Sequence, residues 1–263
     1  MEMMKKQMLD TLKSLKEEYG IVAVKAEFEA EGSRTDELIL LNEVVYRANM
    51  DLVIKIGGCE AVRDLDQTRL LGASGVMAPM IETPFAMKKF CEAANRVYGE
   101  DKSQIEWIIN TETKTCYENF DAILEAGKGF VNTIAIGRVD LSSSMGLSRK
   151  DINTSEQLYE VCADFARRAR AAGLRVGMGG GISMDAIPFI SQIAPLLDKF
   201  ESRKIVFRVE KDEAKLRAAI LKAMEFETLY LKFKGAFYNR MAQEDAQRIQ
   251  MMEDRIQIAY AQE

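Results

Sequence analysis

Short apolar runs alternate with longer amphipathic segments along most of the chain. The runs are rich in β-branched residues and are expected to form strands, while the segments between them carry apolar residues at helical spacing. Seven runs qualify as strands: residues 21–28, 52–56, 74–81, 105–110, 174–178 and 204–209, and the run that starts at Ile134 and stops at Asp140. This alternation indicates parallel βαβ units.

The number of strands and the length of the chain together favour one architecture. A chain of 263 residues can form a single TIM-type (β/α)8 barrel, although seven strand signals are one short of eight. We expect the barrel domain to cover residues 1–212 and helices to follow over residues 213–263.

The C-terminal extension carries two apolar patterns. Leu216, Ile220 and Met224 form a stripe, and Ile249, Met252, Ile256 and Ala259 follow a 3-4-3 heptad spacing. We expect this extension to pack on the barrel or on a neighbouring subunit, which makes a homo-oligomer the expected assembly.

Composition and charge exclude several classes of protein. The net charge of -5 and the pI near 5.2 leave no basic surface for nucleic acid. No apolar run is long enough to cross a membrane, and the N-terminus resembles no targeting signal, so a cytoplasmic protein is expected. The chain has no histidine, which removes His-based catalytic triads and histidine metal ligands.

Ionisable residues recur where the apolar runs stop. Such positions gather at one face of a parallel barrel, where active sites form. They are Glu27 and Glu29, Lys55, Glu82, Asn110 with Glu112, Asp140, the glycines at 179–181, and Arg208.

Glu112 and Asp140 follow successive strands, so the two carboxylates are expected to lie close together. They would repel each other unless a cation lies between them. Mg²⁺ or Mn²⁺ suits such oxygen ligands, and a bridge by Lys55, Lys114 or Arg138 is the alternative. Asp140 could instead cap the helix that follows it.

Two motifs carry a resemblance to a known family. Residues 110–124, Asn-Thr-Glu-Thr-Lys-Thr-Cys-Tyr-Glu-Asn-Phe-Asp-Ala-Ile-Leu, and residues 136–146, Ile-Gly-Arg-Val-Asp-Leu-Ser-Ser-Ser-Met-Gly, resemble the paired motifs of the HpcH/HpaI aldolase and citrate lyase family. Residues 54–58 and 76–82 fall where that family has its third and fourth strands. The resemblance implies a metal-dependent barrel of the phosphoenolpyruvate/pyruvate superfamily that makes or breaks a carbon-carbon bond beside a 2-oxo acid.

The resemblance also implies roles for individual residues. Glu112 and Asp140 match the metal ligands, and Asn110 matches the polar residue before the metal glutamate. Lys55 stands where the family usually has an arginine that stabilises the enolate. The substrate carboxylate would be held by the main-chain N–H groups near Gly137, Arg138, Val139 and Asp140.

The chain departs from the family in three places. The aldolase branch uses an Asp/His dyad as its base, whereas this chain offers Glu27 or Glu29, or else a metal-bound water. Lysine at position 55 replaces a planar, bidentate arginine with a flexible point charge. The first strand of the family also has no counterpart, so we expect an atypical or missing first strand or an incomplete barrel.

The glycines Gly179, Gly180 and Gly181 allow two interpretations. Their N–H groups could hold a phosphate or carboxylate with help from Arg208 or Arg138, or they could simply form a tight turn. The charges near the barrel mouth could likewise form a structural ion-pair network rather than a catalytic site; these are Glu27, Glu29, Glu31, Arg34, Arg63 and Asp64.

We therefore expect a Mg²⁺- or Mn²⁺-dependent carbon-carbon lyase or aldolase that acts through the enolate of pyruvate or a related 2-oxo acid, with an aldehyde or similar acceptor. Another reaction of the superfamily, on a phosphorylated substrate, is the first alternative. The second is a non-catalytic protein that binds a small acid or scaffolds a partner.

Overall fold

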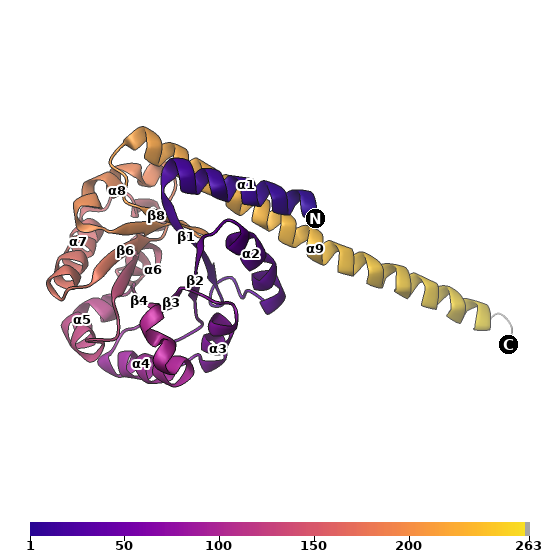
Figure 1. Ribbon diagram of the computed structural model, residues 1–263, viewed down its shortest axis with the longest axis horizontal. Coiled ribbons are helices and arrows are strands. Elements are labelled where there is room, and N and C mark those ends of the chain that lie inside the picture. Colours follow the sequence, from indigo (N-terminus) through magenta and orange to yellow (C-terminus); the bar gives the residue numbers. More distant parts are fainter. Residues whose placement is uncertain (261–263) are drawn as a thin grey trace.

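A computed structural model describes residues 1–260 and shows one closed barrel of eight strands (Figure 1). The strands follow one another around the ring in chain order. They are β1 (Ile21–Glu27), β2 (Asp51–Lys55), β3 (Gly75–Ala78), β4 (Glu106–Thr111), β5 (Thr133–Gly137), β6 (Arg175–Gly179), β7 (Lys199–Glu201) and β8 (Ile205–Arg208). The predicted (β/α)8 barrel is confirmed.

Helices cover the outside of the barrel, as the apolar spacing predicts. They are α1 (Glu2–Tyr19), α2 (Thr35–Arg47), α3 (Val62–Leu70), α4 (Pro84–Tyr98), α5 (Lys114–Ala126), α6 (Arg138–Ser144), α7 (Glu156–Ala171), α8 (Ile187–Ile193) and α9 (Glu213–Tyr260), with short 3-10 helices η1 (Gly99–Gln104), η2 (Arg149–Asp151), η3 (Met184–Ala186) and η4 (Ala194–Leu196). The single helix predicted for residues 184–197 is instead broken into η3, α8 and η4.

The eighth strand differs from the predicted parallel arrangement. Strand β8 runs antiparallel to both of its neighbours, β7 and β1, whereas the other neighbouring strands are parallel. Only residues 202–204 join β7 to β8, and a parallel connection needs a crossover of about a dozen residues or more. The two strands must therefore form a hairpin.

The strand that the sequence did not reveal is β7, not one at the start of the chain. It has three residues, too few to show a period of two. The N-terminal segment is helical, as expected, and the barrel is complete because β8 fills the place between β7 and β1.

The main core lies between the barrel and its helices, and a small apolar cluster fills the lower part of the barrel. The inner cluster consists of Ala23, Val53, Met77, Ile108, Ala135 and Val206. Polar residues take over above it, towards the C-terminal ends of β1 to β7. This apolar layer closes the barrel beneath the polar end and provides a rigid base for the residues there.

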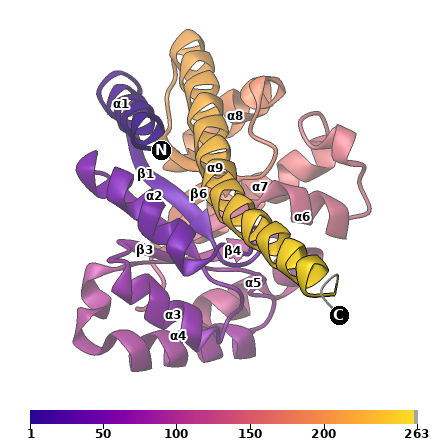
Figure 2. The same ribbon diagram turned by 90° about the vertical axis from the view of Figure 1, so that its right-hand side faces the viewer.

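Helix α9 is a single helix of 48 residues, and its outer half projects well beyond the barrel (Figures 1 and 2). Its inner half packs beside α1 and buries Leu216, Ile220, Phe226 and Phe233. Met224, expected in this stripe, is exposed instead. The extension predicted over residues 213–263 is described as far as residue 260. None of the helices in the described chain has the length and apolar character that a bilayer crossing requires.

Candidate active site

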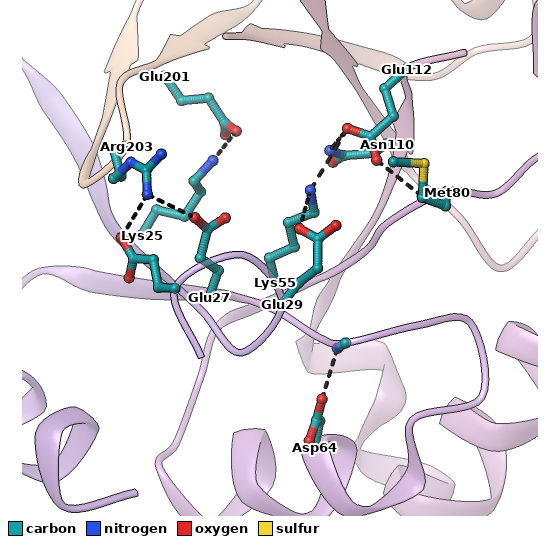
Figure 3. A network of polar contacts seen from close by, with 12 residues as sticks. Lys25, Glu27, Glu29, Lys55, Asp64, Met80, Asn110, Glu112, Glu201 and Arg203 are labelled. Carbon is teal, nitrogen blue, oxygen red and sulfur yellow. Dashed lines mark hydrogen bonds and ion pairs between the residues drawn. The ribbon is translucent and has the colours of Figure 1, made fainter. Parts of the chain in front are cut away.

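A polar cavity of about 350 Å³ opens at the C-terminal ends of the parallel strands. It is lined by most of the residues that the sequence predicts for the site: Glu27, Glu29, Lys55, Asn110, Glu112, Gly137, Val139, Asp140, Gly179, Gly180 and Gly181. Figure 3 shows two groups of charged side chains that face each other there. The parallel strands therefore bring residues from distant parts of the chain to one place.

The first group surrounds Lys55 at the end of β2. Its Nζ lies 2.8 Å from Glu29 Oε2 and 3.7 Å from Glu112 Oε2. Burial lowers the pKa of Lys55, but the charges of Glu112 and Glu29 outweigh it and raise that pKa above its ordinary value. Lys55 is therefore a permanent positive charge fixed between two carboxylates.

Glu112, which directly follows β4, is held from several sides. Its Oε2 accepts a hydrogen bond of 2.6 Å from Asn110 Nδ2, and its Oε1 accepts one of 3.0 Å from the Met80 N–H. Burial raises the pKa of Glu112, and the charge of Asp140 adds to that effect. The Asn110 Oδ1 atom is buried without a hydrogen-bond partner within residues 1–260, so it can accept a hydrogen bond from a ligand.

Met80 adopts an unusual backbone conformation to make its contact with Glu112. Its φ is 50°, in the left-handed region that non-glycine residues rarely occupy. Such strain costs about 1–3 kcal/mol and persists where the surrounding structure requires it. The β3–α4 connection therefore supports the position of the Glu112 carboxylate.

Asp140 lies in the first turn of α6, beyond the end of β5. The N-cap of α6 is Gly137, so the alternative that Asp140 caps this helix is wrong. Its carboxylate is exposed to the cavity and forms no ion pair with residues in the described part of the chain. Asp140 is therefore free to bind a ligand.

The donor set fits a divalent ion. Gly137 leaves room for Glu112 beside the β5–α6 turn, since a Cβ at Gly137 would lie 2.5 Å from Glu112 Oε2. Within residues 1–260 no group of three His, Cys, Asp or Glu side chains could hold a metal ion. An ion held by Glu112 and Asp140 would therefore need further ligands from water or substrate, as Mg²⁺ commonly has.

The sequence offers three side chains that could bridge Glu112 and Asp140 in place of a metal ion, and only one of them lies near either carboxylate. Lys55 does approach Glu112, but its shorter contact is with Glu29. Lys114 pairs with Glu118 on the surface of α5. The Arg138 side chain is fully buried, so neither Lys114 nor Arg138 bridges the two carboxylates.

In the second group of charges, Glu27 is predicted from the sequence, whereas Lys25, Glu201 and Arg203 are not. Lys25 Nζ lies 2.5 Å from Glu201 Oε1, and Arg203 Nη1 lies 3.8 Å from Glu27 Oε1 (Figure 3). Lys25 lies inside the apolar run of residues 21–28 and not at its end, where candidate site residues were sought. Alternation was the available signal: Lys25 and Glu27 are two apart and so share a strand face.

The glycine turn after β6 is shaped by Arg138. Gly180 and Gly181 have φ values of 86° and 65°, and the Arg138 guanidinium donates to both carbonyls, at 2.6 and 3.4 Å. A Cβ at Gly180 would also lie 2.8 Å from the Val139 nitrogen. The conformation of this turn thus requires glycine at positions 180 and 181. The Arg138 side chain is occupied by these contacts and is not available to bind a phosphate. Anion binding by the N–H groups of the turn stays a prediction.

Arg208 is not part of this site. Because β8 is antiparallel, its end lies at the opposite mouth of the barrel, in a separate cavity with Glu106, Arg175 and Lys199. The proposed help from Arg208 in holding a phosphate is therefore wrong.

The ion-pair network expected at the mouth exists in part. Glu29 and Glu31 pair with Lys55 and Lys204 rather than with the arginines named from the sequence. Arg34 instead packs over the ring of Tyr238. Asp64 accepts a hydrogen bond of 2.7 Å from the Gly57 N–H.

A barrel with a polar cavity at the C-terminal ends of its strands defines the class of (β/α)8-barrel enzymes. Within that class, the profile of the HpcH/HpaI aldolase/citrate lyase family matches residues 27–178, more than half of the chain. The chain belongs to this family. The family points to a lyase-type enzyme, and no curated protein sequence matches the chain.

Solved structures share the fold at low sequence identity. Citrate synthase SbnG has a TM-score of 0.62 at 15% identity, over 88% of this chain and 90% of its own. An HpcH/HpaI aldolase from Desulfitobacterium hafniense DCB-2 has a TM-score of 0.56 at 16% identity, over 76% and 81%. A family protein from Burkholderia cenocepacia J2315 has a TM-score of 0.59 at 17% identity, over 83% and 90%.

Proposed function

We propose that this protein is a divalent-metal-dependent carbon-carbon lyase that cleaves a 4-hydroxy-2-oxo acid into pyruvate, or a related 2-oxo acid, and an aldehyde. One observation carries the proposal. The buried ammonium group of Lys55 lies 3.7 Å from the Glu112 carboxylate, and Asp140, which follows the next strand, lines the same cavity. The family to which the chain belongs is one of aldolases and citrate lyases.

Glu112 and Asp140 would hold the ion, Mg²⁺ or Mn²⁺. When bound there, such an ion supplies Lewis-acid polarisation of the substrate keto group. Glu112 suits this role because its carboxylate is fixed by Asn110 and Met80, while Asp140 is open to the cavity.

Lys55 would stabilise the negative charge that develops on the keto oxygen. Its ammonium is fixed before the reaction by Glu29, and a preorganised charge in a dry site is worth more than the same charge in water. The buried Asn110 Oδ1 would accept a hydrogen bond from the substrate. The main-chain N–H groups of residues 137–140 would orient its carboxylate.

Glu27 is the better candidate for the general base. Glu29 is held in a close ion pair with Lys55, 2.8 Å away, whereas the nearest cation paired with Glu27 in the described part of the chain is Arg203, at 3.8 Å. Glu27 would remove the proton of the C4 hydroxyl group. The C3–C4 bond then breaks, its electron pair forms the enolate, and a proton returns to C3 to give the 2-oxo acid.

The test is pyruvate release from a panel of 4-hydroxy-2-oxo acids with Mg²⁺ or Mn²⁺. We expect Asp140→Ala and Lys55→Met each to lower kcat/KM about 100-fold or more, as loss of an electrostatic stabiliser does. Asp66→Ala, an exposed carboxylate on α3, should behave as the unaltered protein.

Calorimetry on chelator-stripped protein, with pyruvate present, separates metal binding from turnover. Ion binding that Asp140→Ala abolishes is expected. Absence of any Mg²⁺ or Mn²⁺ binding contradicts the metal site, and binding of ion and pyruvate without turnover of any panel member favours the non-catalytic alternative.

A further inference from the structure

A second polar cavity, the lower cavity, opens at the other mouth of the barrel and has a volume of about 590 Å³. Arg175, Lys199 and Arg208 line it from β6, β7 and β8. The inner apolar cluster, which includes Val53 and Val206, separates it from the cavity of the candidate active site. A ligand in the lower cavity would therefore bind independently of that site.

The antiparallel direction of β8 brings Arg208 to this mouth of the barrel. Val206 belongs to the inner apolar cluster, and residues two apart share a strand face, so Arg208 also faces the barrel interior. Lys199 is its direct partner across the β7–β8 ladder. Because like charges that face each other across two strands are destabilising, this pair calls for a nearby anion.

The protein supplies such an anion to Lys199 but not to Arg208. Glu106 Oε1 lies 2.6 Å from Lys199 Nζ and 3.3 Å from Arg175 Nη2, and it also accepts a hydrogen bond from Thr133. Arg208 is exposed to the cavity, and within residues 1–260 its guanidinium forms no ion pair and donates no hydrogen bond. Its donors are therefore available to a ligand.

The other carboxylates at the lower cavity do not compensate Arg208. Asp198 Oδ1 lies 3.2 Å from Arg170 Nη2, and its Oδ2 accepts a hydrogen bond of 2.7 Å from the Val176 N–H. Asp51 forms no ion pair with any residue in the described part of the chain, and its strand β2 is separated from β8 by β1. A positive charge is thus left over at this cavity, although the whole chain has a net charge of -5.

We propose that the lower cavity is a second binding site, which takes the phosphate group of a small ligand on Arg208 and Arg175. The oxygens of a phosphate can accept hydrogen bonds from two guanidinium groups at once, and its charge relieves the repulsion between Arg208 and Lys199. Gln104 and Asn132 add neutral hydrogen-bonding groups to the lining. Pockets of about 300–1,000 Å³ hold small molecules, so there is room for the rest of a phosphorylated ligand.

Calorimetric titration with inorganic phosphate, at an ionic strength fixed with sodium chloride, tests this site. Phosphate should bind to the unaltered protein, and Arg208→Gln should weaken that binding about ten- to a hundredfold, the effect of losing charge-assisted hydrogen bonds. Arg175→Gln should weaken it as well, and Arg208→Lys should retain part of it. Acetate, which has fewer acceptor oxygens and a single charge, should bind at least about tenfold more weakly than phosphate.

Two arginine variants serve as controls. Arg167 is 54% exposed on the outer surface of α7, and Arg167→Gln should bind phosphate as the unaltered protein does. Arg203 lines the cavity of the candidate active site, and Arg203→Gln should also bind phosphate normally. Loss of binding in Arg203→Gln but not in Arg208→Gln would place the phosphate at the wrong mouth and overturn the proposal. Absence of phosphate binding to the unaltered protein, or equal binding of acetate, would also overturn it.

The fold of Arg208→Gln is checked without phosphate. Because Arg208 has no partner to lose and faces Lys199, its replacement should leave the thermal denaturation midpoint unchanged or slightly higher. Phosphate should then raise the midpoint of the unaltered protein by mass action and raise that of Arg208→Gln less. Asp140→Ala should bind phosphate normally, so a failure of the proposed function leaves this inference unaffected.

Discussion

At the scale of single residues, Gly137 and Glu112 share a space that has no room for a methyl group. In Gly137→Ala the new Cβ would lie 2.5 Å from Glu112 Oε2 and 2.8 Å from Glu112 Cβ. We expect the variant to lose about 1–3 kcal/mol of unfolding free energy, as overpacking does, and to lose Mg²⁺ binding because the carboxylate is displaced. Urea denaturation and calorimetry measure the two effects.

Gly58→Ala is the control for that change. A Cβ at Gly58 would meet no neighbouring side chain within 4 Å, and Gly58 has an ordinary φ, so alanine there should leave both stability and ion binding intact. Equal behaviour of the two variants would show that Glu112 does not depend on the space at Gly137.

Glu106, at the opposite end of the barrel, provides a pH-dependent prediction. Burial alone would raise the pKa of Glu106, but Lys199 and a hydrogen bond from Thr133 outweigh it, so the pKa is lowered. The ionised form therefore stabilises the fold above the ordinary pKa of 4.5, and this contribution disappears as the pH falls through the lower folded-state pKa.

Glu106→Gln should cost about 3 kcal/mol at neutral pH, since Lys199 is left buried without its partner. Urea denaturation over a series of pH values should show the difference from the unaltered protein shrinking below pH 4.5. Glu118→Gln, in an exposed pair with Lys114, is the control. A difference that is constant with pH would contradict the assignment.

The sequence predicts some of the residues that line the cavity and not others, for a simple reason. Lys55, Glu112 and Asp140 stand where apolar runs stop, and the ends of parallel strands share one face of a barrel. Arg203 follows a three-residue strand that has no recognisable pattern. Its position became apparent only once the hairpin was known.

At the scale of elements, Lys204 joins the β7–β8 hairpin to two other parts of the fold. It is 1% exposed, pairs with Glu31 in the β1–α2 connection, and lies 4.8 Å from the ring centre of Tyr230 on α9. Lys204→Met should cost about 3 kcal/mol, because it leaves the nearly buried Glu31 with only the longer contact to Arg203, at 3.9 Å. Thermal denaturation measures the loss.

Two further variants test whether the Lys204–Glu31 ion pair accounts for this loss of stability. Lys222→Met removes an exposed pair with Glu225 on the same long helix and should cost less than about 1 kcal/mol. Adding Glu31→Gln to Lys204→Met should recover part of the lost stability. A neutral Lys204→Met would show that the three elements are held by apolar contacts instead.

The order of strands and helices could be predicted almost completely, but the direction of β8 could not. The run at residues 204–209 has the same apolar pattern whether it is parallel or antiparallel. Its direction depends on the short connection from β7, and β7 was not recognised. Similarly, the break around α8 depends on Pro195 and local 3-10 turns rather than on apolar spacing.

At the scale of the whole molecule, the outer half of α9 carries apolar residues that nothing in residues 1–260 covers. Ile249, Met252 and Ile256 follow the heptad spacing and are 57%, 42% and 50% exposed. A stripe of this kind on a projecting helix is typical of an interface, and a homo-oligomer remains our prediction.

Analytical ultracentrifugation of Ile249→Asp/Ile256→Asp tests this assembly. The unaltered protein should sediment as an oligomer, and the double variant should shift towards the monomer because buried like charges repel. Gln250→Asp/Gln257→Asp adds the same charges one position further along the helix and should keep the oligomer. If the unaltered protein sediments as a monomer, the prediction that α9 mediates oligomer formation is wrong.

The antiparallel closure of the barrel also affects how the chain folds. Strand β1 pairs with β2 on one edge and with β8 on the other. Because β8 is the last strand to be synthesised, the N–H and C=O groups on the second edge of β1 stay unpaired until then. Contacts between residues this far apart in the sequence slow folding, and unpaired strand edges that are prone to aggregation are then exposed for longer. Formation of the complete sheet therefore follows synthesis of the barrel rather than accompanying it.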